Sequence, residues 1–223
     1  MAIHPIDFRY GTPEMRAVFS EENRFLSIVQ AEIALARAGA DFDLIPPVAA
    51  SQIQENALAA SLVRAKEIEE AINHDMMAIV RAISEVCGDA GGFVHYGATS
   101  NDILDTATGL QLKEALGILD AKLRCLLAVL VCRSRETRHL VCAARTHGQI
   151  GVPTTYGLRF AIWAAEVARH LDRLAALTPR VAVGQLTGAV GTQAALGEKG
   201  MEIQERMMHY LGLVPVEVAN QVI

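Results

Sequence analysis

The chain has 223 residues, of which 52% are hydrophobic and 20% charged, and its formal net charge is −5. This length is enough for one large or two small domains with a sizeable core. The acidic balance and the lack of a basic block argue against nucleic acid as a partner, because phosphate backbones are bound by clustered Lys and Arg. The longest apolar run, CLLAVLVC at 125–132, is far shorter than the roughly 20 residues of a membrane span, so it predicts a buried helix and not a membrane anchor.

The first residues and the cysteines both fit a protein of the cytoplasm. MAIHPIDFRYG contains no charged segment followed by an apolar one, so no secretory signal is visible. The cysteines show neither a disulfide framework nor a CxxC pair, which suits a reducing cytoplasm. They are Cys87, Cys125, Cys132 and Cys142. His139, Cys142 and His147 have an irregular spacing that matches no zinc pattern.

Apolar residues at three- and four-residue spacing predict helices along most of the chain. Pro13 marks the start of a short helix, and a main helix over 21–38 follows and stops at Gly39. IPPVAASQIQENA predicts a turn and then a helix from about Pro47. A further helix is expected from about Val63 to Val86, before the glycine-rich break CGDAGG.

The longest predicted helix runs from Asn101 to about His139. Leucines recur along it at steps of four and three, a coiled-coil-like seam on a helix about 55–60 Å long. The seam consists of Leu112, Leu116, Leu119, Leu123, Leu126 and Leu130.

After the polar stretch ARTHGQIGVPTT, a helix is predicted from near Pro153 to about Val183. The glycine-rich loop GQLTGAVGTQAALGEKG and a helix over MEIQERMMHYLGL follow, and no strand pair with hairpin chemistry is expected. The pattern predicts an all-α protein. We expect a small helical N-terminal domain over 1–108 and the first part of a long central helical bundle over 109–223. Since the final EVANQVI is apolar and uncapped, we expect an N-terminal fragment or a chain that needs other subunits.

One polar motif, VHYGATSNDILDTA, opens the long helix. Thr99 and Asp102 form a capping-box variant, and capping alone would explain them and Ser100. Capping does not explain His95, nor Gly97, which allows close approach of the backbone. The positive end of a long helix with free N–H groups also suits an anion. Both interpretations remain open from the residues alone.

Three further polar motifs stand out. RTHGQ (145–149) is a polar break between two apolar predicted helices. Its His147 suits proton transfer near neutral pH, although a lone His is more often structural. His74 and Asp75 lie in NHDMMAIV, where a surface or core role is the plain alternative. Arg9 and Tyr10 form a pair suited to a phosphate and a sugar or ring, which alone is a weak signal.

Together these motifs resemble the fumarase/aspartase superfamily, and within it the adenylosuccinate lyase branch. The resemblance covers essentially the whole chain, through RYGTPEMRAVFSEEN, NHDMMAIV, VHYGATSNDILDTA, RTHGQIGVPTTYG, GQLTGAVGTQA and NQV, in that order. HYGATSNDILDTA is shared with carboxymuconate cycloisomerases, whereas RTHGQ and RYG favour the adenylosuccinate lyases.

The resemblance implies β-elimination of fumarate from succinyl-AMP, and from succinylaminoimidazole carboxamide ribotide, in purine nucleotide biosynthesis. It implies no metal or organic cofactor, and a homotetramer whose active sites draw on three subunits. The reaction needs a base beside a carboxylate, fixed donors for the carbanion and an acid for the departing nitrogen.

Residue roles follow by matching motif. The resemblance makes His147 the general acid, while Thr99 and Ser100 hold the succinyl carboxylates. His74 assists the acid or binds phosphate. The other expected substrate-binding residues are Asn73, Asp75, Arg9, Tyr10 and Gln221, with His95 and Thr146 as second-tier candidates.

Two departures from the family pattern bear on activity. Asn73 stands where the family usually has Arg or a similar residue before HD. The family's SSxMPxKxNP loop, which supplies the general-base Ser, does not occur in the 223 residues, so we expect this chain alone to be inactive. The alternatives are a carboxymuconate cycloisomerase-like relative and a catalytically silent helical assembly module.

Overall fold

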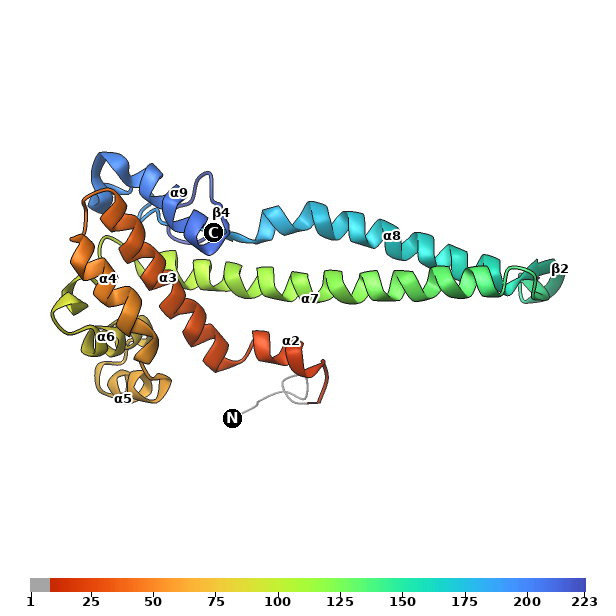
Figure 1. Ribbon diagram of the computed structural model, residues 1–223, viewed down its shortest axis with the longest axis horizontal. Helices are drawn as coiled ribbons and strands as arrows, with labels where there is room; N and C mark the ends of the chain where they lie inside the picture. The colour runs from red at the N-terminus through yellow and green to blue at the C-terminus, as the bar shows by residue number, and fades with distance from the viewer. Residues whose placement is uncertain (1–8) are drawn as a thin grey trace. The chain divides into compact units, whose positions relative to one another are not determined.

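The computed structural model describes residues 9–223, which are mostly helical (Figure 1). The chain forms two compact units. We call Met1–Glu114 with Pro179–Ile223 the body unit, and Ala115–Thr178 the hairpin unit. The predicted all-α class is confirmed. The division into domains 1–108 and 109–223 stays a prediction, since compactness within this chain is a different property from the domain organisation of the whole protein.

The body unit begins with α2 (Pro13–Val18), α3 (Glu21–Asp41) and α4 (Pro47–Asn56), followed by the 3₁₀ turn η1 (Ala57–Ala59). Proline opens α2 and α4, where its missing N–H is not needed. Ser20 caps α3 by accepting the N–H of Asn23 at 3.1 Å. The predicted stop at Gly39 is wrong by two residues. The helix continues to Asp41, and the Gly39 carbonyl accepts the N–H of Leu44 at 2.8 Å as the chain turns.

The helix predicted from Val63 to Val86 is two helices, α5 (Leu62–Ile72) and α6 (Asp75–Cys87). Asn73 ends α5 in the left-handed conformation with φ of 53°, which asparagine tolerates better than most residues. His74 is extended and caps α6. The 3₁₀ turn η2 (Gly88–Phe93) then occupies the predicted glycine-rich break.

The long helix α7 (Ser100–Glu136) confirms the predicted helix from Asn101. The last part of the body unit contains β3 (Val183–Gly184), the 3₁₀ turn η3 (Ala194–Lys199), α9 (Gly200–Leu211) and β4 (Val214–Pro215). Strands β3 and β4 pair in parallel, and α3 packs against both α4 and α9. The fully buried side chains of this core include Ile28, Leu35, Ile53, Met76, Ile83, Ile103, Ile203 and Met207.

The hairpin unit corrects the expectation that no strand pair is present. Strands β1 (Val141–Thr146) and β2 (Gln149–Thr155) are antiparallel, and α8 (Tyr156–Val181) follows. The two residues between the strands, His147 and Gly148, have φ of 50° and 75°. Positive φ at both central residues is what a type I′ hairpin turn requires. The predicted helix start at Pro153 is therefore wrong, since Pro153 pairs with Ala143 in the strands.

The leucine seam of α7 divides into two rows within the hairpin unit. Leu130 is buried in a small core with Ala164 and Val167 of α8, and Leu123 packs against this core. Leu119 and Leu126 stay 42% and 45% exposed. One α8 segment leaves further large apolar side chains exposed, namely Leu158, Ile162 and Trp163. The sequence expectation that these helices need more partners is consistent with this exposed surface.

Gly109 allows α7 to pack closely against β3, so a larger residue at this position is expected to destabilise the protein. A Cβ at this position would collide with the carbonyl oxygen of Val183 and would also meet Leu213. Gly109→Ala is expected to lower the free energy of unfolding by about 1–3 kcal/mol, measured by chemical denaturation. Gly117→Ala is the matched control on the same helix, where a Cβ meets no described atom within 4 Å. It is expected to stabilise by about 0.5–1 kcal/mol through helix propensity. Equal effects of the two changes would contradict this account.

None of the helices within residues 9–223 combines the length and apolarity of a membrane-crossing segment. Among the same residues, no three His, Cys, Asp or Glu side chains gather in a way that could hold a metal ion.

Candidate active site at the start of the long helix

The start of α7 has the predicted cap. The N–H of Thr99 donates to Oδ2 of Asp102 at 2.9 Å, and the N–H of Asp102 donates to the carbonyl oxygen of Thr99 at 3.0 Å. The Asp102 side chain, three residues after Thr99, thus accepts the backbone N–H of the capping residue, as in a capping box. The Thr99 and Ser100 hydroxyls and the N–H groups of Ser100 and Asn101 have no hydrogen-bond partner among residues 9–223. Thr99 and Ser100 are half-buried. Unpaired donors at the positive end of a long helix suit an anion.

Asp102 also holds a second segment against this helix start. Its carboxylate is fully buried. Besides the Thr99 N–H, it accepts the N–H of Thr187 at 2.9 Å and that of Gly188 at 3.1 Å. A buried carboxylate with three backbone donors is well compensated for its lost hydration. The predicted glycine-rich loop is thereby fixed at the same place as Thr99 and Ser100.

Gln185 extends this network to the last residues of the chain. It is fully buried, and its backbone exchanges hydrogen bonds with the hydroxyl of Thr106 at 3.1 and 3.2 Å. Its side-chain amide donates to Asp105 at 3.0 Å and to the carbonyl of Gln221 at 2.9 Å. The predicted substrate-binding residue Gln221 is therefore held in the body unit through its backbone, and its side chain is exposed.

His95 precedes the helix start by five residues and is held by Glu32 of α3. Its backbone N–H donates to Glu32 Oε2 at 2.9 Å, and its Nδ1 lies 2.6 Å from Glu32 Oε1. Burial alone would lower the pKa of His95. The hydrogen bond and charge of Glu32, together with the charge of Asp102, outweigh burial and raise the pKa above its ordinary value. His95 thus carries positive charge beside the α7 start over a wider pH range than a free histidine.

The predicted residues Asn73, His74 and Asp75 form the junction between α5 and α6. Nδ1 of His74 accepts the N–H of Met77 at 3.3 Å, so the capping form of the ring is the neutral tautomer with its proton on Nε2. Nδ1 also lies 3.8 Å from the Asp75 carboxylate, a contact that is favourable only with a proton on Nδ1. The capping hydrogen bond is the shorter of the two contacts and satisfies an N–H group in the first turn of α6. Both side chains are largely exposed.

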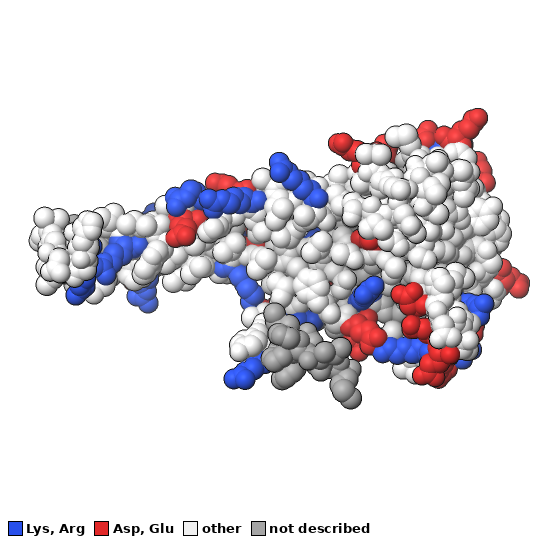
Figure 2. Space-filling model, turned by 180° about the vertical axis from the view of Figure 1, so that it is seen from behind, with Lys and Arg blue, Asp and Glu red and all other residues white. Residues whose placement is uncertain are grey.

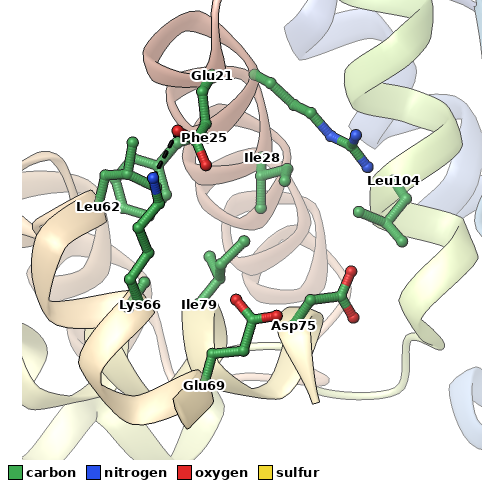
Figure 3. Close-up of a pocket in the computed structure, with 11 residues that line it drawn as sticks. Glu21, Phe25, Ile28, Leu62, Lys66, Glu69, Asp75, Ile79 and Leu104 are labelled. Carbon is green, nitrogen blue, oxygen red and sulfur yellow. Dashed lines mark hydrogen bonds and ion pairs between the residues drawn. The ribbon is translucent and has the colours of Figure 1, made fainter. Parts of the chain in front are cut away.

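Asp75 lines a cavity of about 190 Å³ where α3, α5, α6 and α7 meet (Figure 3). Apolar side chains form its floor, among them Phe25, Ile28, Ile79 and Leu104. Its charged rim comprises Glu21, Arg24, Lys66, Glu69 and Asp75. The Lys66 amine is paired with Glu21 at 2.6 Å, and the carboxylates of Glu69 and Asp75 lie apart from that pair (Figure 3). The rim therefore offers both charge signs above an apolar floor.

The other predicted residues lie elsewhere. Arg9 and Tyr10 are exposed, with the guanidinium 5.8 Å from the ring centroid of its neighbour. Thr146 and His147 are exposed at the end of β1 and in the β1–β2 turn. They belong to the hairpin unit, whereas all other predicted site residues belong to the body unit. Within the body unit the structure brings Thr99 and Ser100 together with the loop at 187–188 and with His95.

Sequence reasoning missed Glu32 and Gln185. Glu32 follows Ile28 by four residues on the buried face of α3 and precedes Leu35 and Ala36 on that face. A carboxylate within an apolar row is a signal that could have found it, because Glu is rarely buried without a partner. Gln185, in contrast, is one of many polar residues in a glycine-rich loop, and its neighbours in the fold are far away in the sequence.

Known proteins resemble this chain along essentially its whole length. The profile of the lyase family matches residues 7–222. Adenylosuccinate lyase of Methanocaldococcus jannaschii is 52% identical over 226 residues, covering 100% of this chain and 49% of that protein. N-acetyl-S-(2-succino)cysteine lyase of Dickeya dadantii is 43% identical, covering 96% of this chain and 48% of that protein. The chain spans about half the length of the curated relatives it matches.

Solved structures resemble the chain to a similar extent. A fumarate lyase from Mesorhizobium sp. BNC1 has a TM-score of 0.87 and 33% identity, covering 94% of this chain and 51% of that one. The β-carboxy-cis,cis-muconate cycloisomerase of Acinetobacter calcoaceticus sp. ADP1 has a TM-score of 0.88 and 31% identity, covering 97% and 52%. The resemblance inferred from the motifs is confirmed, and the chain belongs to the lyase family of the fumarase/aspartase superfamily.

Proposed function

We propose that the protein is an adenylosuccinate lyase, which eliminates fumarate from succinyl-AMP and from succinylaminoimidazole carboxamide ribotide in purine nucleotide biosynthesis. The observation that carries the proposal is the start of α7. Two half-buried hydroxyls and two N–H groups without a partner among residues 9–223 lie there at the positive end of a long helix, fixed by the buried carboxylate of Asp102. This arrangement suits a carboxylate, and the archaeal relatives at about 50% identity support the choice of substrate.

In the proposed reaction, Thr99 and Ser100 hold a carboxylate of the succinyl group. Donors fixed on this carboxylate favour loss of the proton from the carbon beside it, because they stabilise the negative charge that develops there. His147 then protonates the departing nitrogen as general acid. The 223 residues contain no SSxMPxKxNP-type segment, so we propose that the base comes from outside them and that this chain alone is inactive. No metal or organic cofactor takes part in these steps.

The remaining predicted residues are assigned to the nucleotide. Arg9 and Tyr10 contact the phosphate and ribose, His74 assists the acid or binds phosphate, and Gln221 contacts substrate. Asn73, Asp75 and Thr146 line the same site. An imidazole with a free Nε2–H, as in the capping form of His74, can donate to a phosphate oxygen or to another ring.

The distribution of charge supports a polyanionic substrate. Residues 115–178 contain nine Lys and Arg against four Asp and Glu, whereas the rest of the chain contains eleven against twenty-one. Acidic side chains accordingly gather on the body unit (Figure 2). No Asp or Glu occurs from residue 137 to 165, the segment that carries His147. A positive segment attracts a ligand that bears a phosphate and two carboxylates.

We further propose a cytoplasmic homotetramer with shared active sites. The general acid belongs to the hairpin unit and the carboxylate-binding residues to the body unit. Exposed apolar side chains on α7 and α8, such as Leu126 and Trp163, offer surface for other subunits to cover. All four cysteines are free, as suits a reducing compartment.

The test compares substrates on the purified product of the complete gene, because the 223 residues alone are proposed to be inactive. Fumarate release is followed from succinyl-AMP, from the ribotide and from N-acetyl-S-(2-succino)cysteine, and 3-carboxymuconate is tested for cycloisomerisation. For succinyl-AMP we expect kcat/KM of about 10⁴ M⁻¹ s⁻¹ or more, within the ordinary range of enzymes. A preference for either of the last two compounds would assign the protein to another branch. No turnover of any of them would favour the silent assembly module.

A further inference from the structure

Glu32 is a buried carboxylate to which the proposed reaction gives no role. Its side chain is 0% exposed, in the middle of α3 and among the apolar residues of the body core. An isolated carboxylate in such a place is strongly unfavourable, so its presence calls for a cationic or multiple-donor partner. His95 is that partner, and it uses both carboxylate oxygens.

The two contacts fix the histidine completely. The backbone N–H binds one oxygen at 2.9 Å and Nδ1 binds the other at 2.6 Å. His95 has φ of 65°, a conformation that is strained for a residue other than glycine. Such strain persists only where surrounding contacts determine it, and the Glu32 carboxylate supplies two of them. Glu32 therefore sets both the position and the orientation of the ring.

The opposite nitrogen of the ring, Nε2, does not contact Glu32. Nδ1 is taken by Glu32, and Nε2 has no partner among residues 9–223. In the same part of the chain no buried side-chain nitrogen or oxygen lacks a partner, so Nε2 must reach the surface. It does so through a side chain that is only 12% exposed. A donor fixed in this way, five residues before α7, loses little freedom when it binds a ligand.

We propose that Glu32 is a positioning residue that holds His95 as an imidazolium, whose Nε2–H binds an anionic oxygen of the substrate beside the start of α7. The inference rests on the proposed function for the identity of the substrate. The anionic oxygen belongs either to a succinyl carboxylate or to the nucleotide phosphate. The charged groups that act on His95 are Glu32 from α3 and Asp102 from α7.

The test measures equilibrium binding of AMP and, separately, of fumarate by calorimetry between about pH 5.5 and 9, the range in which histidines titrate. Wild-type protein is expected to bind one of the two ligands more weakly as pH rises through the raised pKa of His95. In Glu32→Gln this loss of affinity moves to lower pH. At neutral pH the affinity falls about tenfold or more, the effect of a lost charged hydrogen bond. The ligand that shows the shift identifies the oxygen, carboxylate for fumarate or phosphate for AMP.

Glu22→Gln is the matched control, an exposed carboxylate on the same helix, and it is expected to leave both binding curves unchanged. If Glu32→Gln does not fold, the double variant Glu32→Gln with His95→Gln removes both charges and leaves none unpaired. It is expected to fold and to lose the pH dependence entirely. A wild-type pH profile in Glu32→Gln, or in the double variant, would overturn the inference.

A stability measurement separates this role from packing alone. The folded-state pKa of His95 is raised, so the ion pair stabilises fully below the unfolded pKa of about 6.5. That contribution disappears as pH rises through the folded-state value. The stability difference between wild type and Glu32→Gln is therefore expected to shrink with rising pH, and a constant difference would indicate packing only. Binding is measured without turnover. Normal fumarate release with unshifted binding overturns the inference alone, and absence of both release and binding overturns the proposed function with it.

Discussion

Asp102→Ala is expected to lower the free energy of unfolding of the body unit by about 3 kcal/mol or more, because each buried donor left without a partner costs about 1–3 kcal/mol. The carboxylate accepts the N–H groups of Thr99, Thr187 and Gly188 in a fully buried position. Alanine offers no acceptor, so these three backbone N–H groups would lose their partner. Chemical denaturation followed by circular dichroism measures the change.

Two further substitutions define what Asp102 contributes. Asp102→Asn keeps one acceptor oxygen and is expected to lose less stability than alanine. Asp120→Ala is the matched control on α7, where the carboxylate is 36% exposed and paired with Arg124 on the surface. Exposed pairs of this kind contribute little to stability, because solvent screens them. If Asp102→Ala and Asp120→Ala destabilised the protein equally, the proposed linkage between the helix start and the loop at 187–188 would be wrong.

His147→Gln is expected to lower kcat for fumarate release by about 10²–10⁴-fold, the usual contribution of a general acid. The side chain is exposed in a two-residue turn, so little packing is lost with the imidazole. Thermal unfolding is therefore expected to stay near the wild-type value. The measurement is steady-state release of fumarate from succinyl-AMP by the protein as its gene encodes it.

His139→Gln serves as the control, because His139 is also an exposed histidine of the hairpin unit, with Nε2 accepting from Arg138 at 2.9 Å. It is expected to retain wild-type kcat. Loss of activity in both variants with a lowered unfolding temperature would point to damage of the hairpin. Full activity of His147→Gln would remove this residue from the proposed mechanism.

Local patterns in the sequence predict much of the body unit and the start of the site. Pro13 and Pro47 open helices, and the Thr99–Asp102 spacing forms the expected cap. The long helix from Asn101 agrees with α7 because its signals are local: a cap, an apolar period and good helix formers. Such features depend on residues three or four positions apart, and these can be read directly.

The errors arise where a single residue decides the backbone. Asn73 ends α5 by taking up a left-handed conformation inside a pattern that continues to look helical on both sides. The His147–Gly148 pair forms a tight hairpin turn, although the usual pairs for such turns are Asn-Gly, Asp-Gly and Gly-Gly. Gly148 is typical of such a turn, but His147 at the first central position is not, so the pair does not stand out as a hairpin signal.

The long-range parts of the site could not be read from the sequence. Glu32 and His95 are 63 residues apart, and Asp102 and Thr187 are 85 apart. Such pairs depend on how α3 and the glycine-rich loop pack around α7, and no local period encodes that packing. The sequence showed that a polar motif opens a helix. The structure adds that Glu32 of α3 holds His95 of the motif, and that Asp102 of the motif holds the loop at 187–188.

We propose that Ser100 of one subunit and His147 of another serve the same lyase site. The most direct measurement is fumarate release from succinyl-AMP by an equal mixture of the Ser100→Ala and His147→Gln proteins, dissociated and reassembled together. Each variant alone is expected to be nearly inactive. Random reassembly of a symmetric oligomer would restore up to about a quarter of the wild-type activity, since about one site in four then draws both intact residues. A mixture no more active than its components, beside an active wild-type protein, would contradict the claim.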